Sequence, residues 1–324
     1  MYTRAKVLLL ALTFLLVVSN AGNSLAATVS SGSGIKLSPV RYDLTLDPGQ
    51  SKTIQFNVQN VTKGTATYEA VVTDFSASGQ NGAPQLIVTG SKFNPHSIKQ
   101  FLSPIQNFTV AANQTKSVNI KISIPKVTAG GGYYGAIRFL SVNSQTNKTV
   151  NVASSVAGLI LITVPGPAMK ESVTLSSFAA GINGQLGKLF YSNGNISVYA
   201  TFKDTGNVQE QPFGQVVVNN ISGDKIETKL INNTTPAGNV LPGSSRTFSV
   251  PLTGLGMLGK YTVSGYFGYG TKGQLLSAKT TFYVIAPWII ILAIVLIALI
   301  IVAIFFMPKI FRLWYKRSIR KAQR

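Results

Sequence analysis

Short runs in which apolar and polar residues alternate dominate the chain between residues 27 and 287. The clearest run is Ser117–Ile124, where Val118, Ile120, Ile122 and Ile124 share one side. A period of two is typical of a β-strand with one buried face. Similar patterns predict strands over Thr53–Asn60, Ala66–Val72, Val156–Val164, Ile196–Phe202, Gln215–Val218, Phe248–Leu252, Tyr261–Phe267 and Thr281–Ile285. With no convincing helical period in this region, we expect an all-β fold of two immunoglobulin-like β-sandwich domains.

A continuous apolar segment near the C-terminus has a different pattern. From Trp288 to Met307 every side chain is apolar, which is long enough for one helix across a hydrocarbon core of about 30 Å. The seventeen residues that follow contain seven Lys and Arg residues and no acid. Because cationic segments beside a spanning helix stay on the cytoplasmic side, we expect the preceding residues to lie outside the cell membrane.

The N-terminus has the composition of a secretory signal peptide. Arg4 and Lys6 precede the apolar run Val7–Val18, and small residues follow that suit cleavage after Ala26. The alternative is an uncleaved anchor, which would give the chain two membrane passes.

The predicted organisation has five parts. We expect a signal peptide over residues 1–26, a first sandwich over 27–166, a second over 167–285, a transmembrane helix over 286–307 and a basic tail over 308–324. The boundary between the sandwiches is set at Pro165-Gly166-Pro167, because a Pro-rich joint is stiffer than a Gly/Ser linker. Only Ala286-Pro287 separates the last predicted strand from the apolar helix, so the second sandwich is expected to lie at the membrane.

A turn sequence recurs in front of predicted strands. Leu46-Asp-Pro-Gly precedes one strand and Leu241-Pro-Gly precedes another, and Ala111-Ala-Asn-Gln is a weaker version. Pro followed by Gly suits a type II turn. The similarity fits either two copies of one domain or independent use of the same turn chemistry.

The composition limits the compartments in which the protein can be expected and the kinds of partner it can be expected to bind. The absence of cysteine favours a bacterial or archaeal surface over a secreted eukaryotic domain. The formal net charge is +20, and residues 27–287 carry twenty Lys and Arg against nine Asp and Glu. Such a surface attracts anionic envelope polymers or lipid, although dispersed lysines can also serve solubility alone. Nucleic acid is not expected as a partner outside the cell.

The sequence shows no catalytic constellation, so we do not expect an enzyme, a metal site or a cofactor. The only histidine, His96, lies in a Pro-rich segment and is interpreted as a solvated loop residue. Asp204-Thr-Gly-Asn207 matches an aspartic protease signature once. It is better explained as a turn after the strand Ile196–Phe202.

A glycine-rich segment supplies the candidate binding residues. After Gly130-Gly-Gly132, alternation puts Tyr134, Ala136 and Arg138 on one side of a strand and Tyr133, Ile137 and Phe139 on the other. One hypothesis is an exposed surface in which Tyr134 stacks on sugars and Arg138 holds an anionic group. The alternative is a framework strand whose tyrosines fill the rim of the core.

These features together resemble the WxL-interacting surface proteins of Gram-positive bacteria. The resemblance rests on the Leu46–Gln50 turn, the Ile124-Pro125 strand end and the segment Ala129–Phe139, followed by a second sandwich, a membrane helix and a basic tail. It implies a peptidoglycan-binding first domain and a second domain that binds host or partner proteins.

The sequence thus predicts a membrane-anchored extracellular binding or structural protein. Peptidoglycan, an anionic wall polymer or other surface proteins are the expected partners. The alternative is an export-side assembly chaperone that acts through a strand edge.

Overall fold

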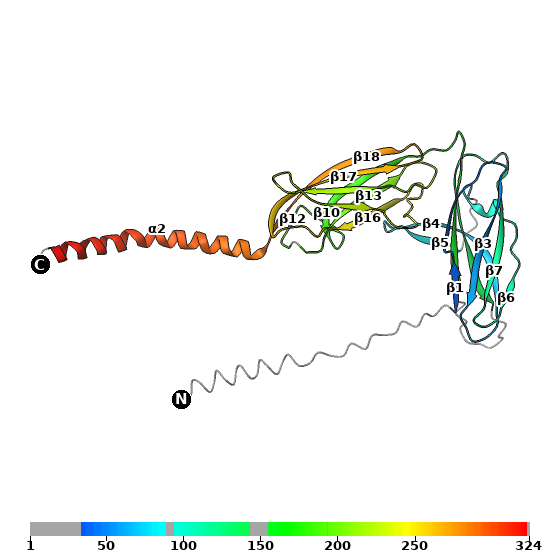
Figure 1. Ribbon diagram of the computed structural model, residues 1–324, viewed down its shortest axis with the longest axis horizontal. Coiled ribbons are helices and arrows are strands. Elements are labelled where there is room, and N and C mark those ends of the chain that lie inside the picture. The colour runs from blue at the N-terminus through cyan, green and yellow to red at the C-terminus, as the bar shows by residue number, and fades with distance from the viewer. Residues whose placement is uncertain (1–33, 89–93, 143–154, 193, 323–324) are drawn as a thin grey trace, which may run out of the picture. The chain divides into compact units, whose positions relative to one another are not determined.

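The computed structural model describes residues 34–88, 94–142, 155–192 and 194–322, with the backbone alone over 309–322. The predicted signal peptide, residues 1–26, lies outside this part. The described chain is all-β apart from one short 3-10 turn, η1 (Ile98–Phe101), and one C-terminal helix, α2 (Pro287–Ala322) (Figure 1). The predicted fold class is therefore confirmed.

The N-terminal strands form two sheets. A three-stranded sheet has the order β1-β3-β7, and a larger sheet has the order β2-β9-β8-β4-β5 with β6 also paired to β4. The pair β2–β9 is parallel and the other pairs are antiparallel. The bounds are β1 Ile35–Ser38, β2 Arg41–Thr45, β3 Ser51–Asn60, β4 Ala66–Ser78, β5 Ala83–Ile87, β6 Phe108–Val110, β7 Thr115–Ser123, β8 Gly131–Val142 and β9 Ser155–Val164. We call this unit the first sandwich.

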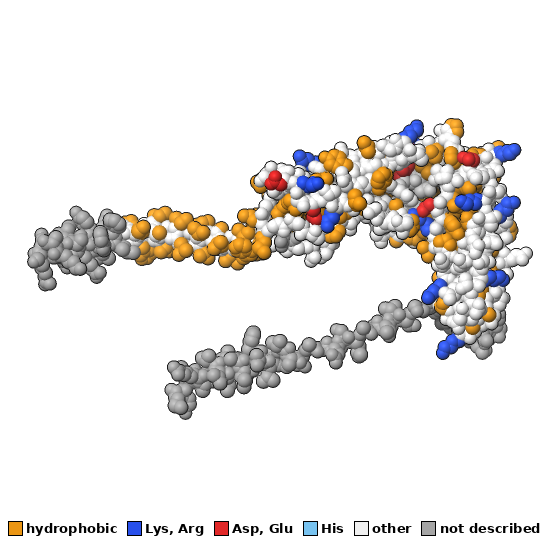
Figure 2. Space-filling model, in the orientation of Figure 1, with side chains coloured by type: hydrophobic (Ala, Val, Ile, Leu, Met, Phe, Trp, Pro, Cys, Tyr) orange, Lys and Arg blue, Asp and Glu red, His pale blue; other side chains and the backbone are white. Residues whose placement is uncertain are grey.

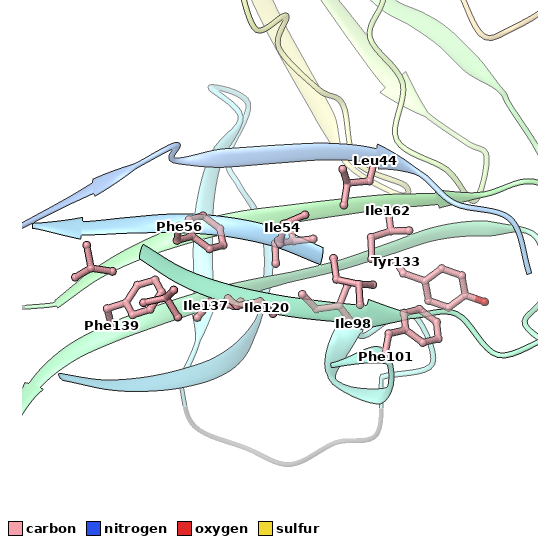
Figure 3. Packing of buried hydrophobic residues seen from close by; sticks show 14 of the residues in the cluster. Leu44, Ile54, Phe56, Ile98, Phe101, Ile120, Tyr133, Ile137, Phe139 and Ile162 are labelled. Atoms are coloured by element: carbon pink, nitrogen blue, oxygen red, sulfur yellow. The ribbon is translucent and has the colours of Figure 1, made fainter. Parts of the chain in front are cut away.

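The period-two pattern explains the core of the first sandwich. Alternate residues of β3 and β7 point to the same side and meet residues of β8 and β9 from the other sheet (Figure 3). The side chains of Phe56 and Phe139 meet edge to face, with ring centroids 5.9 Å apart. Both are fully buried. Such aromatic pairs stabilise a core beyond the area they bury.

Close packing around Phe56 gives the first prediction. Gly158 lies in β9, and a Cβ atom at this position would overlap the ring of Phe56. We expect Gly158→Ala to lower the free energy of unfolding by about 1–3 kcal/mol, because the well-packed core must shift to accept one more methyl group. Gly64→Ala is the matched control, since nothing lies within 4 Å of its Cβ position. Chemical denaturation of both variants checks this, and equal stabilities would contradict the packing.

The recurring turn sequence adopts the same geometry at all three places. The third residue has positive φ, at 86° for Gly49, 74° for Gly243 and 58° for Asn113. In each four-residue turn the backbone amide of the fourth residue donates to the backbone carbonyl of the first at 2.9–3.1 Å. The pairs are Gln50 to Asp47, Ser244 to Leu241 and Gln114 to Ala111. The type II turn expected from Pro-Gly explains why glycine occupies that position, and Asn is the residue that best replaces glycine there.

The second group of strands forms a four-stranded sheet, β11-β10-β13-β16, and a five-stranded sheet, β12-β18-β17-β14-β15. We call this unit the second sandwich. Its core lies between the sheets and contains Phe202, Phe267 and Phe282, each almost fully buried. The bounds are β10 Val173–Ile182, β11 Gln185–Leu186, β12 Leu189–Phe190, β13 Ile196–Asp204, β14 Phe213–Asn219, β15 Lys225–Ile231, β16 Ser245–Pro251, β17 Leu258–Tyr269 and β18 Gln274–Ile285.

Helix α2 follows β18 after a single intervening residue. Its segment Pro287–Pro308, 22 residues, is long and apolar enough to cross a membrane. Figure 2 shows that hydrophobic side chains cover this part of the helix. The helix continues to Ala322, so the residues expected as a tail from Pro308 onward begin within the helix rather than after it.

Hydrogen bonds join the two sandwiches at a junction. The amide of Gly132 donates to the carbonyl of Asn207 at 2.8 Å, and the amide of Thr247 donates to that of Gln80 at 2.7 Å. The guanidinium of Arg41 donates to the carbonyl of Ala237 at 2.7 Å. Hydrogen-bond donors and acceptors of one sandwich are thus paired with those of the other at this junction.

Candidate functional site

Strand β8 carries both residues predicted to bind a ligand. It lies between β4 and β9 in the larger sheet of the first sandwich. The predicted alternation is present, because Tyr133, Ile137 and Phe139 belong to the core of the first sandwich. Tyr134 and Ala136 belong to a separate cluster on the other face of the sheet.

Tyr134 is buried rather than exposed. Only 9% of the residue is accessible, and its ring meets Phe75 edge to face at 6.4 Å. Leu161 belongs to the same cluster, and Leu241 from the second sandwich packs against it. An exposed stacking platform at Tyr134 therefore does not match the structure, and the framework alternative does. The physical reason is that the second sandwich covers this face of the sheet.

The hydroxyl of Tyr134 lies in an unusual environment. Among the described residues nothing forms a hydrogen bond with it. Burial raises the pKa of this phenol, and the negative charges of Asp204 and Glu210 raise it further, while the nearby backbone of Gln209 lowers it in part. The phenol is therefore neutral at physiological pH, and its side chain serves packing.

Two substitutions separate packing from hydroxyl chemistry at Tyr134. We expect Tyr134→Ala to lower the free energy of unfolding by about 3 kcal/mol, because it removes a buried ring. Tyr134→Phe keeps the ring and removes a hydroxyl without a partner, so its stability should stay within about 1 kcal/mol of the parent. Urea denaturation measures both. A Tyr134→Phe variant as unstable as Tyr134→Ala would show that the hydroxyl has a partner.

Arg138 is half-buried on the same strand. Its backbone pairs with Val71 on β4 and Ala157 on β9. Its Nε atom is buried and, within the described part of the chain, has no hydrogen-bond partner. The binding role of Tyr134 and Arg138 stays a prediction.

The outer face of the three-stranded sheet has the chemistry of a polar binding surface. Gln55 Nε2 donates to Asn57 Oδ1 at 3.0 Å and to Ser117 Oγ at 2.7 Å, and Ser117 Oγ donates to Asn57 at 2.9 Å. Hydroxyl and amide side chains make up this face, together with two lysines: Lys36, Ser38, Ser51, Thr53, Gln55, Asn57, Gln59, Thr115, Ser117, Asn119, Lys121 and Ser123. We call these residues the polar face.

The polar face suits an extended, hydrophilic ligand. None of its residues is acidic, and Lys36 and Lys121 are both exposed. Amide and hydroxyl groups can donate to and accept from sugar hydroxyls and peptide groups. The alternation in the sequence predicts that these positions face solvent. Their pairing across β1, β3 and β7 is visible only in the fold.

Two buried carboxyl groups lie at the junction between the sandwiches. Asp204 is 0% and Glu210 4% exposed. Each accepts one amide hydrogen bond, Asp204 from Gly206 at 2.7 Å and Glu210 from Gly270 at 3.0 Å. The second oxygen of each has no partner among the described residues.

Burial shifts the ionisation of both groups. It raises the pKa of Asp204 to about 7, against the effect of the Gly206 hydrogen bond. It also raises the pKa of Glu210 to about 7, with further increases from the charges of Glu171 and Asp204. No group of His, Asp and Glu side chains within the described residues could hold a metal ion.

The segment Asp204–Asn207 begins at the last residue of β13, and Asn207 connects the sandwiches. Asn207 Nδ2 donates to the carbonyl of Ala168 at 2.8 Å, and Asn207 Oδ1 accepts from the amide of Lys170 at 2.7 Å. Its backbone carbonyl accepts from Gly132. A structural role in holding the joint therefore accounts for these residues, and no local sequence pattern predicts that role.

His96 is exposed, as expected, but not isolated. Its Nδ1 lies 2.9 Å from the carbonyl of Gly132, which makes this nitrogen the donor. Its ring lies 5.7 Å from that of Tyr133. These contacts connect the loop to the start of β8.

A hollow of about 660 Å³ lies on the outer face of the five-stranded sheet. Four exposed side chains border it: Phe213, Leu230, Tyr266 and Leu275. None of the described residues lining it is charged. Sequence reasoning missed this hollow because its apolar residues come from four strands, and each strand alone has an ordinary pattern.

Comparison with known proteins finds one family similar to part of the first sandwich. Residues 37–141 match the family described as WxL Interacting Protein, peptidoglycan binding domain. No curated protein matches the sequence as a relative.

Solved structures are similar to this chain only at low identity and low TM-score. A chaperone–tip adhesin complex of CFA/I fimbriae and the class 5 fimbriae chaperone CfaA are 15% and 14% identical, with 76% of this chain and 98% of theirs covered and a TM-score of 0.37 for each. A Csu pilus chaperone–subunit complex from Acinetobacter baumannii is 12% identical, with 75% and 97% covered and a TM-score of 0.33. Likenesses this weak carry no argument about function.

The family match runs from Leu37 in β1 to Ser141 in β8. It includes the segment predicted to bind and every polar-face residue except Lys36, and it does not reach β9. Over residues 37–141 this chain therefore matches the peptidoglycan binding domain of the WxL Interacting Protein family, and the match supports a cell-surface binding protein.

Proposed function

We propose that this chain is a membrane-anchored protein that docks a cell-wall polymer of the peptidoglycan type outside a prokaryotic cell. The observation that carries the proposal is the match of residues 37–141 to a peptidoglycan binding domain. Helix α2 supports the anchoring, because Pro287–Pro308 has the length and composition of a membrane span. The seven cations after the apolar run favour an orientation with both sandwiches outside.

The polar face is the surface that we assign to the polymer. It offers neutral hydrogen-bonding groups in register on three strands, with Lys36 and Lys121 as the charged members. Residues 27–166 contain eleven Lys and Arg against four Asp and Glu, so the first sandwich attracts anionic polymer over a Debye length of about 8 Å. Arg138 remains a second candidate contact on the opposite sheet.

A chaperone role is the second candidate, and one feature favours it. Strand β15 pairs only with β14 and forms an edge of the five-stranded sheet. It carries Leu230, which borders the uncharged hollow. A partner strand could add to this edge and place apolar side chains in the hollow.

Parallel capture experiments separate the two candidates. The full chain in detergent micelles is mixed with purified cell wall in one arm and with the exported proteins of the same cells in the other. We expect retention by the wall that survives removal of wall-bound proteins. Capture of unfolded subunits alone, lost in Leu230→Arg, would replace the proposal with the chaperone role.

A further inference from the structure

The end of the second sandwich at which α2 begins is tied to the helix without a flexible linker. Strand β18 ends at Ile285, and α2 begins at Pro287. The intervening Ala286 donates its amide to the carbonyl of Met257 at 2.8 Å, and its own carbonyl accepts from Ile289 at 3.0 Å. The start of the helix is therefore hydrogen-bonded to the segment before β17.

Large apolar side chains are exposed around this point. Leu186 is 52%, Tyr191 55% and Met257 54% exposed. The same group includes Leu189, Leu258, Tyr283 and Trp288, each 44–61% exposed. We call these seven residues the collar. A hollow of about 590 Å³ lies among the collar residues that precede β13.

Backbone pairing holds the collar beside the helix start. Strand β12 pairs in parallel with β18 at Tyr283 and Val284, and Leu258 pairs with Ile285. The amide of Tyr283 donates to the carbonyl of Lys188 at 2.7 Å. Phe190, 6% exposed, packs on Phe282 at 5.6 Å and fixes the segment that carries Leu189 and Tyr191.

The chemistry of the collar matches a membrane–water interface. Trp and Tyr are enriched there because their rings are amphipathic. Lys188 and Lys260 are exposed in the same segments, and neither residues 182–192 nor 254–262 contain an acid. This combination of apolar side chains, aromatic rings and cations suits the headgroup and acyl boundary of a bilayer that contains anionic lipid.

We propose that the collar inserts into the interfacial region of the bilayer and seats the second sandwich directly on the lipid surface. The inference rests on the proposed membrane anchoring by α2, because a spanning helix brings the collar to the bilayer through the covalent chain. The seat restrains the second sandwich, so that the first sandwich is not presented on a freely rotating tether.

Site-specific labelling tests the seat, because the chain contains no cysteine. Leu186→Cys and Met257→Cys are each labelled with an environment-sensitive fluorophore in the full chain. The chain is reconstituted in vesicles of phosphatidylcholine and phosphatidylglycerol. Lipids brominated near the carbonyl end of the acyl chain serve as the quencher.

Two further positions make the result interpretable. Leu275→Cys is the matched control, since Leu275 is 83% exposed on β18. It lies ten residues, about 33 Å along the strand, from the end of β18 that leads into α2. Val295→Cys, within α2, reports whether the helix itself is in the bilayer.

We expect the labels at positions 186 and 257 to be quenched at least threefold more than the label at 275. Quenching at 295 with values at 186 and 257 equal to that at 275 would overturn the seat and leave the anchor intact. Absence of quenching at 295 would overturn the anchoring and the seat together. A blue shift at 186 and 257 without lipid quenching would indicate contact between copies of the chain and would also overturn the seat.

Discussion

Truncation of the chain after Ile285 is expected to release the protein from membranes. The change removes the 22-residue apolar segment Pro287–Pro308 and the cations that follow. Insertion of such a helix is effectively irreversible, whereas interfacial contacts alone give weak and reversible binding. After digestion of the wall, more than nine-tenths of the truncated protein should be soluble, against almost none of the full chain.

A matched variant removes only the basic residues. Deletion of residues 309–324 keeps the apolar segment, so the protein should stay with the membrane even after an alkaline wash. Immunoblots of the fractions measure both variants. A truncated protein that sediments with washed membranes would contradict anchoring by α2.

Folding stability is expected to fall as pH rises from about 5 to 8. Burial raises the pKa values of Asp204 and Glu210 to about 7 in the folded protein, above the ordinary values of 3.8 and 4.5. At pH values between the ordinary pKa and the folded pKa, the folded state keeps these two carboxyl groups protonated, whereas the unfolded state has released the protons. Raising the pH therefore favours unfolding, and the penalty is complete above about pH 7.

The groups facing these carboxyls do not offset the penalty. Glu171 adds negative charge near Glu210, and the neutral phenol of Tyr134 faces both acids. Each pKa unit corresponds to about 1.4 kcal/mol, and relaxation at the junction reduces the full shift, so we expect a loss of about 2–4 kcal/mol between pH 5 and 8.

Asp204→Asn tests this account with little change in shape. Asn accepts the Gly206 hydrogen bond and cannot ionise, so the variant should be more stable than the parent at pH 8 by about 2 kcal/mol and similar to it at pH 5. Asp224→Asn changes an exposed acid and serves as the control. Denaturation curves at several pH values give the comparison. Stability of the parent that increases toward pH 8 would show that these carboxyls are solvated or paired.

The alternation of apolar and polar residues predicted most of the strands, because one face of such a strand is exposed to solvent and the other is buried. Ser117–Ile124 is the clearest case, and β7 covers Thr115–Ser123. The Pro-Gly turns were also predictable, since positive φ at the third position restricts the residue that can occupy it. The C-terminal helix follows from length and composition alone.

The functional surfaces were less accessible because they depend on contacts between distant segments. Tyr134 follows the alternation of an exposed face, but Leu241, more than a hundred residues later, packs on its cluster. Asn207 looks like a turn residue, and the bond from the amide of Gly132 to its carbonyl forms only when the two sandwiches meet. The polar face and the collar both combine side chains from separate strands. No pattern within one segment distinguishes such residues from ordinary solvent-facing positions.

Sedimentation of the full chain with purified peptidoglycan tests the central claim most directly. The protein in detergent micelles is mixed with sacculi that carry or lack anionic polymer, over a range of salt concentrations. Lys36→Glu with Lys121→Glu changes the polar face, and Lys272→Glu with Lys279→Glu makes the same charge change in the second sandwich.

We expect the parent to sediment with both kinds of sacculi, more strongly with anionic polymer and less as salt rises, because screening weakens its electrostatic part. The polar-face variant should lose at least tenfold in affinity, and the second-sandwich variant should lose less than threefold. A full chain that stays in solution with both kinds of sacculi at low salt would contradict a wall-docking function.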